Sequence, residues 1–226
     1  MKLLLVFIFL IMTEITTAQV VSYQDEKGKA LSQAQVGALD KKCHGFLSLE
    51  IVQEGPLMMV QVRPPSATEL QTLQKLRQQE TAVLQKKWLD KTLPSFNLGS
   101  TSDKIFSNKN LLGHVTLLFF WSKADYRSIA QLPALSRLVA SQKGKPVQFW
   151  ALTFEDVVLV KDFLKQHPFP FIQLPGNFSF VMEDMGIMQT PVYMLLDKKA
   201  KIKFISTDNQ ANIDLVLLPA LAKWNH

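Results

Sequence analysis

A strand-length run of apolar residues in the middle of the chain constrains the fold more than any other feature. Residues Val115 to Trp121 read VTLLFFW, without the polar alternation expected of a strand that has one face in water. A second run of this kind, VQFWALTF, covers Val147 to Phe154. Strands buried on both faces lie inside a sheet that has other layers packed on each side, so we expect both runs in the centre of one sheet.

A helical pattern follows each of these predicted strands. Residues Asp125 to Ser141 and Asp156 to His167 carry apolar side chains mostly at three- and four-residue steps, which predicts two helices that each bury one face. The order strand, helix, strand, helix is typical of a parallel sheet with helices packed on its faces.

The end of the chain has a different pattern. Two apolar segments, Thr190 to Asp197 and Lys201 to Thr207, are separated by a short polar turn, which is the spacing of a β-hairpin. A last helix is expected from Ala211 to about Trp224. The sequence therefore predicts an α/β fold in which a central mixed sheet is built from a βαβ unit, a β-hairpin and a C-terminal helix.

The first half of the chain divides into smaller parts. We expect a signal peptide at 1–18, a small β-rich accessory region at 19–63 with two short strands about a Gly55–Pro56 turn, and an amphipathic helical linker at 64–92. The main domain is expected at 93–226. Apolar residues of the linker form a stripe that either packs on a neighbouring domain or is offered to a partner.

The N-terminus has the form of an export signal. Met1 and Lys2 precede an apolar run from Leu3 to Met12, and small residues end the segment at Ala18. The run is short of the roughly 20 residues that cross a bilayer. We therefore expect an exported protein, periplasmic or secreted, with no stable membrane span after cleavage. A lipid anchor would need a cysteine directly after Ala18, where there is none.

The positive charge of the chain does not form a nucleic-acid surface. The formal net charge is +6, but the lysines are scattered beside turns and strands rather than concentrated with aromatic residues. We interpret them as a solvated basic surface and expect no nucleic-acid partner.

The segments that follow the first buried strand match a known motif in part. Trp121 ends the strand, Pro133 lies in the next helix, and Thr190–Pro191 precedes the penultimate strand. In these features residues 93–226 resemble exported thioredoxin-like proteins of the TlpA/ResA kind, which are related to the AhpC/TSA proteins. Members of that group carry FWAxWCxxC, a proline in the following helix, and a cis-proline opposite the cysteines.

The resemblance implies a thioredoxin fold with a degenerate active site. It places Asp125 and Ser128 where the group has its two cysteines. A dithiol reductase needs a thiolate at a helix N-terminus and a second thiol one turn later. Neither residue supplies one, so we expect no catalytic residue here and no cofactor. Asp125 is well placed as a helix N-cap, and a carboxylate that binds a cation or acts as a base is the alternative.

The resemblance also implies a binding groove formed by Trp121, Tyr126, Thr190 and Pro191. In the group, the cis-proline loop pairs with the substrate backbone, which requires no sulfur and resembles β-strand addition. The leading hypothesis is therefore a redox-inactive module of the cell envelope that binds an exported peptide or protein of unknown identity.

Cys43 is the single cysteine of the chain and carries the rival hypothesis. Its neighbour His44 points to the opposite face if the segment is a strand, and a metal site needs three or four ligands, so we expect no metal. We interpret Cys43 as a structural thiol. The alternative is an enzyme related to thiol-disulfide oxidoreductases that uses Cys43 or a partner's thiol. A third possibility is a structural subunit that assembles through the 70–88 helix.

Overall fold

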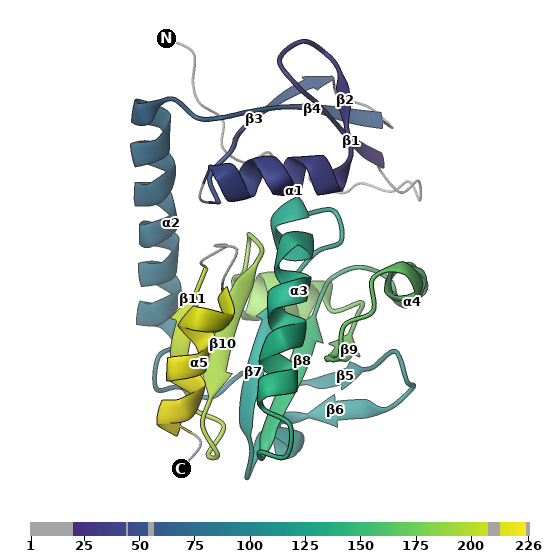
Figure 1. The fold of residues 1–226 in the computed structure, drawn as a ribbon. Coiled ribbons are helices and arrows are strands. Elements are labelled where there is room, and N and C mark those ends of the chain that lie inside the picture. Colours follow the sequence, from purple (N-terminus) through teal and green to yellow (C-terminus); the bar gives the residue numbers. More distant parts are fainter. Residues whose placement is uncertain (1–19, 44, 54–56, 208–212, 225–226) are drawn as a thin grey trace.

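The computed structural model describes residues 20–43, 45–53, 57–207 and 213–224 (Figure 1). The predicted signal peptide, His44 and the predicted Gly55–Pro56 turn lie outside the described residues. Within them, a small unit of residues 20–63, the N-terminal unit, sits across one end of a larger α/β domain, and a long helix runs down the side of that domain (Figure 1).

The core of the larger domain is a sheet whose five described strands are ordered β11-β10-β7-β8-β9. Strands β7, β8 and β9 are parallel, and β10 is antiparallel to both β7 and β11. All side chains of β7 and β10 are buried, which confirms the predicted central strand and the mixed sheet. The strands are Val115–Phe120 (β7), Val147–Leu152 (β8), Ile172–Leu174 (β9), Val192–Leu196 (β10) and Ile202–Ser206 (β11).

Both faces of this sheet are covered, as the unbroken apolar strands require. Three helices pack on one face: α3 (Tyr126–Ser141), α4 (Val157–Gln166) and α5 (Ile213–Trp224). The other face carries a π-helical turn, a 3-10 turn, a two-stranded hairpin and the end of α2. Those elements are η2 (Ser179–Asp184), η1 (Asn108–Leu111), β5 (Asn97–Gly99), β6 (Ile105–Ser107) and α2 (Ala67–Trp88). The predicted thioredoxin-like plan of sheet, hairpin and final helix is confirmed.

In the turn between β10 and β11, an alanine adopts the left-handed backbone conformation that usually requires glycine. Ala200 has φ 59°, a conformation that glycine usually supplies. The Asp197 carboxylate accepts from the backbone N–H groups of Lys199 and Lys201, both at 2.9 Å. These bonds hold the tight turn, which explains how the hairpin forms with alanine at this position.

The N-terminal unit is a four-stranded sheet with one helix on it. Its strands are ordered β2-β1-β4-β3, with bounds Val20–Gln24 (β1), Ala30–Leu31 (β2), Ser48–Gln53 (β3) and Leu57–Arg63 (β4). The helix α1 (Gln33–Lys42) was not predicted, because its only buried residues are Val36 and Asp40 and it has no apolar stripe. Its start does carry a signal: Ser32 and Gln35 form a capping box.

Helix α2 lies along the free side of β11, the outer strand of the large sheet (Figure 1). Its polar side chains bind outward groups of that edge: Gln85 Nε2 donates to the carbonyl of Ile205 at 3.2 Å, and the hydroxyls of Thr81 and Thr207 lie 2.6 Å apart. Of the predicted apolar stripe, Leu84 and Trp88 are buried against the larger domain, whereas Leu76 and Val83 are 37% and 65% exposed. No helix within the described residues is long and apolar enough to span a membrane.

Candidate functional site

The candidate site lies where β7 ends and α3 begins. The side chain of Asp125 caps α3 by accepting from the backbone N–H of Arg127 at 3.2 Å, so the predicted N-cap is present. Ser128 lies one turn further into the helix and is buried. The Thr190–Pro191 peptide bond is cis, and this loop faces Asp125. The structure thus brings together Asp125, Ser128, Thr190 and Pro191.

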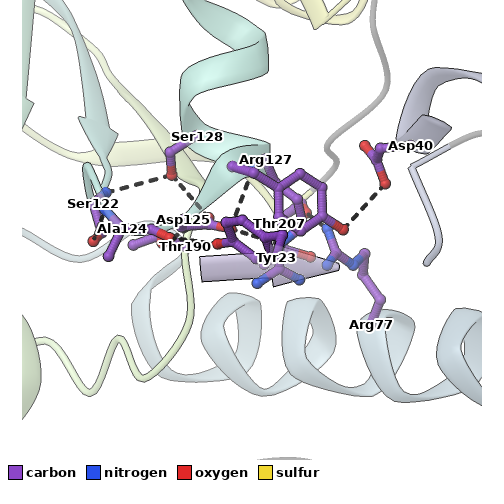
Figure 2. Close-up of polar contacts among 11 residues, drawn as sticks. Tyr23, Asp40, Arg77, Ser122, Ala124, Asp125, Arg127, Ser128, Thr190 and Thr207 are labelled. Atoms are coloured by element: carbon purple, nitrogen blue, oxygen red, sulfur yellow. Dashed lines mark hydrogen bonds and ion pairs between the residues drawn. The ribbon is translucent and has the colours of Figure 1, made fainter. Parts of the chain in front are cut away.

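The carboxylate of Asp125 is hydrogen-bonded on both oxygens (Figure 2). Besides the N-cap bond, Oδ1 accepts from Arg127 Nε at 2.9 Å, while Oδ2 accepts from Ser128 Oγ and from Thr190 Oγ1, both at 2.9 Å. A hydrogen bond between Asp125 and Ser128 therefore stands where the group has a disulfide. The carboxylate also forms an ion pair with the guanidinium of Arg127, whose side chain is 17% exposed.

Glu155 is part of this site, although sequence reasoning missed it. It follows β8, the parallel neighbour of β7, and is 9% exposed. Its carboxylate accepts from Ser122 Oγ at 2.8 Å, from the backbone N–H of Lys123 at 2.7 Å and from Thr153 Oγ1 at 3.2 Å. The signal was available: an acidic residue directly after a buried strand lies at the carboxyl edge of the sheet, beside the end of the neighbouring parallel strand.

Trp121 does not line an open groove. Its side chain is fully buried, with its ring centroid 5.3 Å from that of Phe163 and 5.5 Å from that of Phe169. The prediction failed because the apolar run of β7 continues into Trp121, which turns toward the helices that cover the sheet. We therefore assign Trp121 to the core.

Tyr126 is also covered, and the N-terminal unit covers it. It is 4% exposed and packs edge-on against Tyr23, at a centroid distance of 6.2 Å. Its hydroxyl donates to Asp40 Oδ1 at 3.3 Å. Tyr23 in turn donates to the carbonyl of Ala124 at 3.1 Å, and Gln33 Nε2 donates to that of Lys123 at 3.4 Å. The accessory region was not expected to lie on this part of the site.

Ionisable side chains gather at the contact between the N-terminal unit, α2 and α3 (Figure 2). Asp40 is 2% exposed, and burial raises its pKa to about 6 although Arg127 opposes the shift. Burial also raises the pKa of Tyr23 to about 12. It lowers the pKa of Arg77, whose guanidinium donates to the carbonyl of Thr207 at 2.7 Å. Asp40 is the member of this cluster that ionises nearest to neutral pH.

Cys43 lies at the C-terminal end of α1 and packs against the buried cluster that contains Tyr23 and Tyr126. It is half-buried, and burial and then the nearby Asp40 raise its pKa. Reactive thiols need the opposite shift, toward a stable thiolate. Across the described residues, no group of three or more His, Cys, Asp or Glu side chains could hold a metal ion.

Three large apolar side chains are exposed in the segments that follow β8, enter η2 and precede β10. We call Phe154, Phe178 and Met188 the apolar rim; they are 38%, 48% and 52% exposed. The loops that carry the two phenylalanines are joined, since the N–H of Asn177 donates to the carbonyl of Thr153 at 3.1 Å. Met188 stands two residues before Thr190, whose hydroxyl binds Asp125. Met188 therefore belongs to the same segment as the cis-proline.

Comparisons with known proteins agree on the larger domain. The sequence pattern of the AhpC/TSA family matches residues 89–205, more than half of the chain. The thiol-disulfide oxidoreductase ResA of Bacillus thuringiensis subsp. konkukian is 24% identical over 115 residues, which are 50% of this chain and 66% of that protein. The match thus spans just under two thirds of that relative's length.

Two solved structures share the fold. A Chlorobium tepidum protein assigned as the thiol:disulfide interchange protein DsbE superposes with a TM-score of 0.55 at 20% identity, covering 61% of this chain and 99% of that one. A secreted disulfide oxidoreductase of Mycobacterium tuberculosis, homologous to E. coli DsbE, gives 0.50 at 19% identity, with coverages of 57% and 95%. At these identities the likeness concerns the fold.

Proposed function

Because the chain belongs to the AhpC/TSA family and is thioredoxin-like, yet has Asp125 and Ser128 at the two cysteine positions, we propose that it is a redox-inactive binding protein. The observation that carries the proposal is the pairing of these two residues. Asp125 Oδ2 accepts from Ser128 Oγ and Thr190 Oγ1, so the catalytic positions are filled by a hydrogen-bonded unit rather than by a reactive group.

The binding surface of this proposal is the apolar rim together with the Thr190–Pro191 loop. Phe154, Phe178 and Met188 are large apolar side chains held at the end of a rigid sheet. Such side chains supply most of the free energy when a partner buries them. The occupant we propose is an extended segment of a protein that carries apolar side chains for the rim.

We place this activity outside the cytoplasm. The proposal rests on the residues at 1–18, which have the composition of a signal peptide, and on the secreted relative from Mycobacterium tuberculosis. The partner would then be another exported protein.

Redox inactivity has a direct test. We expect the purified mature protein to leave the rate of insulin reduction by dithiothreitol unchanged, because Cys43 is its single thiol and burial raises the pKa of that thiol. The Cys43→Ser variant should behave identically. Catalysis that disappears in Cys43→Ser would contradict the proposal and support the oxidoreductase alternative.

The binding surface has a separate test. We expect the double variant Phe154→Ala/Met188→Ala to lose captured partner at least tenfold, since each truncated side chain of a contact centre costs about 1–2 kcal/mol of binding free energy. Capture is measured by cross-linking in extracts of the exported fraction and by quantitative mass spectrometry. Leu215→Ala is the matched control, because Leu215 is 64% exposed on α5, outside the rim. Equal capture by the double variant and the control would reject the rim as the binding surface.

A further inference from the structure

The contact between the N-terminal unit and the site loop combines hydrogen bonds with one apolar anchor, Tyr126, which belongs to the same buried apolar cluster as Tyr23 and Val36. Its hydrogen bonds include those from Tyr23 and Gln33 to two carbonyls of the loop and the Tyr126–Asp40 bond, and α1 approaches α3 closely. A Cβ added at Gly37 of α1 would lie 3.9 Å from the Cβ of Ala130 of α3. Relative motion between two parts of one chain is the default expectation unless their interface is large and apolar, and here a single side chain, Tyr126, forms the apolar part of the contact from the side of α3.

Helix α2 would keep the N-terminal unit tethered if that contact opened. Its own anchors lie on other parts of the domain: Arg77 and Gln85 bind carbonyls at β11, and Trp88 Nε1 donates to the carbonyl of Met185 at 2.9 Å. None of these three bonds involves residues 20–63. Opening the contact therefore leaves the large domain and α2 intact.

Asp40 lies at the centre of the contact. From α3, the Tyr126 hydroxyl donates to the Asp40 carboxyl. The positive charges of Arg127 on α3 and Arg77 on α2 lower the pKa of Asp40, whereas the negative charge of Asp125 raises it. From β1, Tyr23 packs on Tyr126, and on α1 itself Lys41 and Cys43 are the nearby ionisable neighbours. The Tyr126 hydroxyl, which donates to Asp40 Oδ1 at 3.3 Å, is a neutral donor. A charge on Asp40 is thus poorly compensated while the contact is closed.

We propose that the N-terminal unit is a tethered cover over the site loop and Tyr126, and that ionisation of Asp40 opens it. The closed state hides Tyr126, and side chains of the N-terminal unit bind the carbonyls of Lys123 and Ala124; the open state makes Tyr126 accessible and frees both carbonyls. The consequence for a partner rests on the proposed function, but opening itself is a property of this chain alone and is tested without a partner.

The direction of the pH effect follows from the shift at Asp40. Burial raises the pKa of Asp40 from 3.8 to about 6 in the closed state, so the closed state binds a proton more tightly than the open one. The contribution of Asp40 protonation to the stability of the closed state is complete below pH 3.8 and is lost as the pH rises through about 6. Between pH 5 and pH 8 the closing equilibrium should weaken about tenfold.

The test is amide hydrogen exchange of the full mature chain at pH 5 and pH 8, with each rate divided by the intrinsic rate at the same pH. We expect the peptides that cover 33–42 and 122–130 to lose about tenfold of their protection at pH 8. Amides of β7 and β10 should keep theirs, which confirms that the fold is intact. Asp40→Asn, which carries no charge at either pH, should abolish the difference.

Two further variants make the result decisive. Asp162→Asn is the matched control, since the Asp162 side chain is 61% exposed and remote from the contact, and it should retain the parent's pH response. Gly37→Cys/Ala130→Cys on a Cys43→Ser background should form a disulfide, because 3.9 Å suits a Cβ–Cβ bridge, and should stay protected at both pH values. Equal protection of the parent at both pH values, or a pH response that persists in Asp40→Asn, would overturn the proposal.

Discussion

Replacing Asp125 and Ser128 by cysteine is expected to restore a disulfide-forming pair. In a Cys43→Ser background, oxidised glutathione should take two electrons and two protons from the new thiols, giving two molecules of glutathione and one intramolecular bridge. The thiol at 125 would stand at the N-terminus of α3 and beside the Arg127 guanidinium, which both favour the thiolate. We therefore expect its pKa to lie below the ordinary value for cysteine.

The measurement is the mass of the protein after oxidation and alkylation. A bridged protein takes up no alkylating reagent until it is reduced, and after reduction it should react with iodoacetamide at pH 6 at least tenfold faster than Cys43 does in the parent chain. Ser128→Cys alone, on the same background, is the matched control because it has no second thiol. Two alkylated cysteines after oxidation would show that the register assigned to these positions is wrong.

Replacing Glu155 by alanine is expected to lower stability by about 3 kcal/mol. The carboxylate accepts from Ser122 Oγ, from the N–H of Lys123 and from Thr153 Oγ1, and it is 9% exposed. Removing it leaves these donors without an acceptor in a site that water barely reaches, and an unmatched buried donor costs more than the bond contributed. The thermal midpoint should fall by roughly 6–12 °C for a chain of this size.

Two variants separate this effect from a loss of charge. Glu155→Gln keeps one acceptor oxygen and should lose about half as much stability as the alanine variant. Glu183→Ala removes an exposed carboxylate and should change the free energy of unfolding by less than about 0.5 kcal/mol. A midpoint of Glu155→Ala equal to that of Glu183→Ala would show that the site loop does not depend on Glu155.

The main domain could be predicted from the sequence because its elements are strongly periodic. The continuous apolar runs at β7 and β8 and the one-sided pattern of α3 each point to a single structure. Tertiary packing was needed for the rest. Asp40 looks like an ordinary surface carboxylate on a polar helix, and only the arrangement in space buries it against Tyr126.

The candidate site was predicted in part. Asp125, Ser128, Thr190 and Pro191 could be placed because the resemblance fixes their positions next to recognisable elements, the first two at the start of α3 and the last two just before β10. The environment of Tyr126 could not, because it depends on contacts with residues about 100 positions earlier in the chain. Sequence periodicity carries no information on which separate unit covers a side chain, so a residue expected in an open groove proved to be buried.

Helix α2 and the residues after it also determine which N-terminal truncations leave a stable fragment. They occupy the outer side of β11: the N–H of Asp90 donates to the carbonyl of Ile202 at 2.8 Å, and Gln85 binds that of Ile205. A fragment that began at residue 89, where the family match starts, would keep the Asp90 bond but lose Gln85 and the rest of α2 from the side of β11, and bare strand edges pair with other chains. We therefore expect the smallest fragment that folds without associating to start before Ala67. The folding unit would then be longer than the segment that matches the family.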